Sequence, residues 1–107
     1  MNIYELLKTA TDRNASDLHL TVGRPPVLRI RGHMVDLPLP VLASADTESL
    51  ARDLAPERSL KELEERRTCD FGYAFEDKGR FRVSIYHQKG DVGIALRLIP
   101  TRILSFE

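Results

Sequence analysis

Three segments of strand character stand close together in the last third of the chain, and two short turn sequences separate them. The segments are residues 70–75, 80–87 and 92–99, and the separators EDKG and QKGD have the composition and length of hairpin turns. Strands joined by such short turns run antiparallel, because a parallel crossover needs a dozen residues or more. This part of the chain therefore predicts a three-stranded antiparallel sheet.

The first third of the chain predicts one helix followed by two strands. Apolar residues at positions 3, 6, 7 and 10 lie on one helical face, with Asn2 available as an N-cap and Asn14 able to end the helix. Residues 17–22 and 27–31 each alternate apolar and polar side chains, and the sequence GRPP interrupts the alternation between them. Two more strands are therefore expected.

The middle of the chain predicts a connector and two surface helices. Residues 34–43 contain two prolines, which fit an extended connector because proline cannot donate to a strand ladder. One helix is expected from about residue 46 to residue 54, and Pro56 either stops it or starts the next helix. Ser59 and Glu62 have the spacing of a capping box, and the polar run to Arg67 continues as helix. The resulting order, α-β-β-α-α-β-β-β, is typical of an α+β domain in which helices cover one face of an antiparallel sheet.

Composition narrows the class of protein further. The 107 residues are 42% hydrophobic and 30% charged, with a single cysteine and a formal net charge of zero. This balance is typical of a soluble globular domain, and no apolar run approaches the roughly 20 residues that cross a bilayer. The N-terminus has no secretory signal, and the cysteine and histidines do not have the spacing of metal ligands. A net charge of zero gives no overall electrostatic field that would attract nucleic acid. We expect a cytosolic domain with no metal site and no nucleic-acid partner.

Alternation places five arginines on the polar face of the predicted sheet. They are Arg29, Arg31, Arg80, Arg82 and Arg97. Like charges opposite one another destabilise a sheet, so the arrangement requires an explanation. Asp17, Asp36 and the acidic helices could pair with the arginines. Alternatively, the face binds an anion, because a guanidinium group suits phosphate or carboxylate.

Other residues that could take part in binding or catalysis are scattered along the chain. Asp17 and His19 lie on one strand face, about 7 Å apart by the strand rise, and are interpreted as interface residues rather than catalytic ones. Cys69 is expected to be a small core residue. Neither G-x-x-x-x-G-K-[ST] nor G-x-G-x-x-G occurs, so the chain has no phosphate-cradling loop with which to hold ATP alone.

Four ordered motifs carry a resemblance to a known family. They are ASDLHL, GRPPVLRIRG, RFRVSIYHQKG and IALRLIP. Together they resemble the N-terminal domain of the retraction ATPases of type IV pili, which drive twitching motility and belong to the wider family of type II and type IV secretion ATPases. The resemblance runs from near Met1 to the end of the chain. It implies that residues 1–107 form a single PAS-like N-terminal domain, and that the RecA-like motor domain of the family is absent from this chain.

The same resemblance implies a role for the arginine face. In the family, arginines of this domain approach the phosphates of the ATP that the motor domain binds with Mg²⁺, in the manner of an arginine finger. The matching positions are Arg82 and Arg97, with Arg80 as a helper in nucleotide binding. Asp17 and His19 are expected to meet a neighbouring domain.

Partners and location follow from the same resemblance. The implied partners are the motor domain of the same chain, the neighbouring subunits of a homo-hexamer and the pilus platform protein of the inner membrane. The assembled machine would lie in the cytoplasm, peripheral to that membrane. The isolated domain is expected to hold no cofactor and to hydrolyse no ATP.

Three other functions stay open from the sequence. One is a nucleic-acid-binding sheet, which would need exposed aromatic side chains on the arginine face, where only Tyr86 qualifies. A pilus-assembly or type II secretion ATPase would use the same domain, but those branches usually carry extra domains before it, and here only fourteen residues precede ASDLHL. A stand-alone PAS-like sensor would need polar groups in its core, whereas alternation places apolar side chains at positions 81, 83, 85, 94, 96 and 98. We therefore expect the retraction branch.

Overall fold

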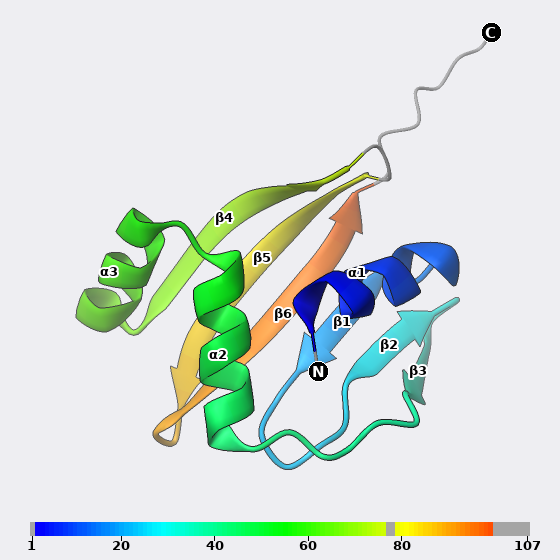
Figure 1. Ribbon diagram of the computed structural model, residues 1–107, viewed down its shortest axis with the longest axis horizontal. Helices are drawn as coiled ribbons and strands as arrows, with labels where there is room; N and C mark the ends of the chain where they lie inside the picture. Colours follow the sequence, from blue (N-terminus) through cyan, green and yellow to red (C-terminus); the bar gives the residue numbers. More distant parts are fainter. Residues whose placement is uncertain (1, 77–78, 100–107) are drawn as a thin grey trace, which may run out of the picture.

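The computed structural model describes residues 2–76 and 79–99. These residues form three helices and six strands: α1 (Ile3–Asp12), β1 (Asp17–Leu20), β2 (Val27–Ile30), β3 (His33–Asp36), α2 (Ser44–Leu54), α3 (Glu57–Arg66), β4 (Thr68–Phe75), β5 (Gly79–Gln88) and β6 (Asp91–Ile99). The strands make one antiparallel sheet in the order β3-β2-β1-β6-β5-β4 (Figure 1). The expected α+β class and the order of its elements are confirmed, with one short strand, β3, in addition.

The sheet joins two sets of hairpin-connected strands. One set is β1, β2 and β3, and the other is β4, β5 and β6. They meet where β1 pairs with β6, with Leu18 opposite Leu96 and Leu20 opposite Ile94. Strands from the two ends of the described chain therefore lie side by side at the centre of the sheet.

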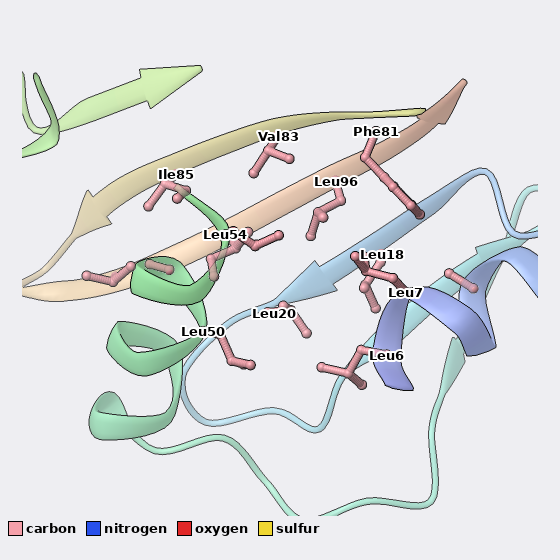
Figure 2. Packing of buried hydrophobic residues seen from close by; sticks show 14 of the residues in the cluster. Leu6, Leu7, Leu18, Leu20, Leu50, Leu54, Phe81, Val83, Ile85 and Leu96 are labelled. Carbon is pink, nitrogen blue, oxygen red and sulfur yellow. The ribbon is translucent and has the colours of Figure 1, made fainter. Parts of the chain in front are cut away.

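The hydrophobic core lies between one face of the sheet and the helices. In Figure 2 the labelled side chains of β1, β5 and β6 point toward α1 and α2. The largest fully buried side chains of these strands are Leu18, Leu20, Phe81, Val83, Ile85, Ile94 and Leu96. The helices contribute Leu6, Leu7, Leu50, Leu54 and Leu63. Burying each leucine stabilises the fold by roughly 1.5–3 kcal/mol relative to leaving it exposed, so these contacts hold the helices on the sheet.

Local signals explain where the first two helices begin. The side chain of Asn2 accepts a hydrogen bond from the backbone N–H of Glu5 at 3.2 Å, so the predicted N-cap of α1 is confirmed. At the start of α2, the carboxylate of Asp46 accepts from the backbone N–H of Ala43 at 2.8 Å.

Among the helices of the described residues, none combines the length and the apolar character needed to cross a membrane.

Two sequence-based assignments in the middle of the chain are wrong. The prolines of the expected connector, residues 34–43, come after Asp36, so they leave His33–Asp36 free to pair with β2 as an edge strand. The capping box at Ser59 does not form; the alternative start at Pro56 is confirmed instead, because α3 begins at Glu57 with Pro56 as its N-cap. Proline is tolerated at a helix start, where its missing N–H costs nothing, and Ser59 is instead buried inside the helix.

Candidate functional site: an arginine-rich sheet face

The face of the sheet opposite the core carries four of the five predicted arginines. All four are exposed: Arg29 on β2, Arg80 and Arg82 on β5, and Arg97 on β6. Arg31 is not among them, and its assignment to this face is wrong. The strand β2 ends at Ile30, and Arg31 and Gly32 turn the chain into β3 with φ angles of 52° and 81°.

Three of these arginines and one aspartate lie in a single line across four neighbouring strands. Asp17 on β1 lies opposite Arg29 on one side and opposite Arg97 on the other. Arg97 in turn lies opposite Arg82. Directly opposite residues have Cβ atoms about 4.5–5.5 Å apart, so we call Arg29, Asp17, Arg97 and Arg82 the arginine row. It sets three positive charges against one negative charge.

Within the row, Asp17 pairs with Arg97. The Oδ2 atom of Asp17 lies 3.5 Å from Nε of Arg97, and its Oδ1 atom accepts a hydrogen bond from the Ser16 hydroxyl at 2.7 Å. The Asp17 side chain is 13% exposed, and that of Arg97 is 69% exposed. The carboxylate is thus held close to the sheet, whereas the guanidinium extends into solvent.

The expectation that acidic residues neutralise the arginine face is therefore only partly right. Asp17 does pair with an arginine of the row, but Asp36 pairs with Arg24, which is outside it, at 3.0 Å. Within the described residues, no other ion pair involves an arginine of the face. Among the described residues Arg29, Arg80 and Arg82 thus have no ion pair, and their charge is available to an anion.

Arg80 extends the positive charge along β5. It lies two residues before Arg82 on the same face, opposite Ile99 of β6. Arg80 and Arg82 line one shallow hollow together with Asp70, Gly72 and Ile99. The structure thus brings together Arg80, Arg82 and Arg97, the three residues expected to contact phosphate, on one accessible surface.

The two expected interface residues also share this face. Asp17 and His19 both point away from the core on β1, and His19 is half-buried opposite Ala95 of β6. Sequence reasoning missed the hydroxyl of Ser16, which bonds to the Asp17 carboxylate. It also missed the hydrogen bond from Ser84 to Asp70, whose partners are far apart in the chain.

No protein-family model matches the chain, but comparison with known proteins finds relatives over its whole length. Over all 107 residues it is 35% identical to the type IV pilus retraction ATPase PilT of Pseudomonas aeruginosa and covers 31% of that protein. A crystal structure of the pilus retraction motor PilT with bound ADP matches with a TM-score of 0.90 and 39% identity, over 99% of this chain and 31% of that one. Along its whole length the chain corresponds to the N-terminal domain of PilT.

A second relative supports the same family. This PilT-type domain is 30% identical over 107 residues to the type IV pilus ATPase PilU of the same organism and covers 28% of it. It therefore spans about a third or less of the length of the relatives it matches. The resemblance inferred from four sequence motifs is confirmed along the whole chain.

The core of the PilT-type domain offers little to a small-molecule ligand. In the part of the chain that the structure describes, the buried polar side chains are Thr47 and Ser59, both within helices. Thr47 already donates its hydroxyl to the backbone carbonyl of Ser44 at 3.2 Å. A ligand pocket needs a few polar groups that converge on the ligand, so these residues do not favour a PAS-like sensor.

Proposed function

We propose that this chain is the N-terminal domain of a hexameric ATPase that powers retraction of type IV pili and twitching motility. In this proposal Arg82 and Arg97 contact the phosphates of a nucleotide that the motor domain holds. The observation that carries it is their placement directly opposite each other on β5 and β6, exposed on the face without helices. The names and nucleotide content of the relatives support the same assignment.

The proposed chemistry is stabilisation of charge. ATP and Mg²⁺ in the motor domain supply the phosphoryl group and its metal. Guanidinium groups hold phosphate oxygens through two parallel hydrogen bonds, and charge develops on those oxygens during transfer. Arg82 and Arg97 would compensate that charge from one side of the site, and Arg80 would assist in binding the nucleotide. Because the domain contributes only these side chains, it would hydrolyse nothing by itself.

The proposed assembly gives the remaining polar residues a partner. Asp17 and His19 would face the motor domain of the same or a neighbouring subunit in the homo-hexamer. The motor would act in the cytoplasm, on a platform protein at the inner membrane. Nucleotide binding between domains would then couple the arginine face to movement between subunits.

The experiment is an alanine substitution in the protein with its motor domain. We expect Arg97→Ala to lower kcat for ATP by a factor on the order of 10²–10³, at or below the low end of the range for arginine fingers. Arg97→Lys should restore little, because an ammonium group cannot form the bidentate fork. Measurement of kcat and KM for both variants, and for Arg82→Ala, tests the proposal.

Arg29→Ala is the matched control. It removes the same charge from the same row, at a position with no proposed contact to phosphate. Equal losses of kcat in Arg29→Ala and Arg97→Ala would mean that the overall charge of the face matters rather than a positioned arginine. An Arg97→Ala enzyme with normal kcat would remove the phosphate role altogether.

A further inference from the structure

We infer that Asp17 is a positioning residue that aims Arg97 at the phosphate. Asp17 would hold the guanidinium through Nε and leave the outer edge, with both Nη groups, free to form the fork. This inference rests on the proposed function, because it assigns a further residue to the same site. It changes the role of Asp17 from an interface residue to a residue that acts through Arg97.

The first observation is that each carboxylate oxygen of Asp17 has a partner. Its Oδ1 atom accepts from the hydroxyl of Ser16 at 2.7 Å, and its Oδ2 atom lies 3.5 Å from Nε of Arg97. The Ser16 hydroxyl also lies 3.3 Å from the carbonyl oxygen of Arg29. The carboxylate therefore has a defined orientation before any nucleotide arrives.

The second observation is the contrast in exposure between the two partners. The Asp17 side chain is only 13% exposed, whereas the Arg97 side chain is 69% exposed. A low-exposure carboxylate can anchor the near side of a guanidinium whose far side stays in solvent. Restricting an arginine in this way reduces the conformational freedom that it loses when it binds phosphate.

The third observation is that Asp17 selects one of two available arginines. The strand pairing places Arg29 and Arg97 on opposite sides of Asp17, yet in the described residues its ion pair is with Arg97. If Asp17 only lowered the net positive charge of the row, a pair with Arg29 would serve as well as a pair with Arg97. The arginine that Asp17 contacts is also the one that is proposed to bind phosphate.

A double-mutant cycle in the protein with its motor domain tests the inference. Asp17→Asn keeps the shape of the side chain but removes its charge. We expect it to lower kcat about 10- to 100-fold with a smaller change in KM, because a displacement of about 1 Å at a reacting centre can cost that much. Added to Arg97→Ala, the same substitution should change kcat by less than about twofold, since the two residues act as one unit.

Asp36→Asn is the matched control. Asp36 forms an ion pair with Arg24 at 3.0 Å, away from the row and with both side chains exposed, so its substitution should leave kcat and KM unchanged. Asp17→Glu should recover part of the lost kcat, because it restores the carboxylate. Ser16→Ala, which removes the hydroxyl that orients Asp17, should give a smaller loss of kcat that also disappears in the Arg97→Ala background.

The outcomes separate this inference from the proposed function. If Arg97→Ala leaves kcat normal, the proposed function fails. If Arg97→Ala lowers kcat but Asp17→Asn and Ser16→Ala do not, the positioning role of Asp17 fails and the proposed function stands. If Asp17→Asn lowers kcat by the same factor in both backgrounds, Asp17 acts apart from Arg97 and the inference is overturned. Should Asp17→Asn not fold, the Ser16→Ala cycle decides the question.

Discussion

The ring of Tyr86 lies against the backbone of Gly93, its partner across β5 and β6. A Cβ atom added to Gly93 would come within 2.5 Å of Cε1 of that ring. The ring would have to move, so we expect Gly93→Ala to lower the free energy of unfolding by about 1–3 kcal/mol. Urea denaturation followed by circular dichroism measures this change.

Gly72 provides the comparison for that substitution. A Cβ atom there would lie 2.9 Å from Nη2 of Arg80, the end of a flexible and exposed side chain that can move aside. Gly72→Ala should therefore change the free energy of unfolding by less than about 0.5 kcal/mol. Similar losses at both glycines would show that the Tyr86 ring is not the cause.

Leu7 is one of the two buried leucines that attach helix α1 to the sheet. Leu7 has no exposed surface and belongs to the same buried cluster as Leu18. Leu7→Ala should lower the free energy of unfolding by about 2–5 kcal/mol, because it leaves a cavity. Lys8→Ala removes only an exposed contact to Asp12 at 3.0 Å and should leave the free energy of unfolding nearly unchanged. Comparable denaturation midpoints for the two variants would contradict the packing of α1.

The single cysteine should react slowly in the folded domain. Cys69 is 1% exposed, as the sequence predicted for a core residue. Burial raises the pKa of its thiol, and the carboxylates of Glu62 and Asp70 raise it further. Because the thiolate is the reactive form, alkylation by iodoacetamide at pH 8 should be much slower in buffer than in concentrated urea. Equal rates in the two conditions would place the thiol at the surface.

The isolated 107-residue chain should not bind ATP with micromolar affinity. Its sequence has no phosphate-cradling loop, and the arginines of the row are exposed to water, where single charged contacts are weak. Isothermal titration calorimetry with ATP and Mg²⁺ checks this expectation. A micromolar dissociation constant, or measurable phosphate release, would indicate a nucleotide site within the domain itself.

Periodicity and local signals predict most of the fold. Alternation correctly separates Phe81 and Val83 from Arg82 between them, and Asn2 correctly marks the start of α1. Errors occur where two local signals compete. Pro56 begins α3 before Ser59 can cap it, and Ile30 ends β2 before Arg31 because the chain turns there.

The candidate site is less predictable than the fold. Alternation assigns Asp17 and Arg97 to the same face, but it contains no information on which residues of distant strands become neighbours. Their contact depends on the pairing of β1 with β6, which no sequence motif specifies. The hydroxyl of Ser16 could have been suspected from its position next to Asp17, because serine side chains often bond locally.

The pairing of β1 with β6 has a consequence for how this domain tolerates change. Side chains repeat every two residues along a strand, so a slip of two residues would keep apolar groups facing the helices. The same slip would move Arg97 about 7 Å from its place beside Asp17. No hairpin turn joins these strands, but the backbone of Ser16 donates to Arg29 at 2.8 Å and accepts from Leu98 at 2.9 Å. One serine backbone thus helps to hold an alignment that the core alone does not enforce, and a misaligned domain could fold stably while its arginines miss their target.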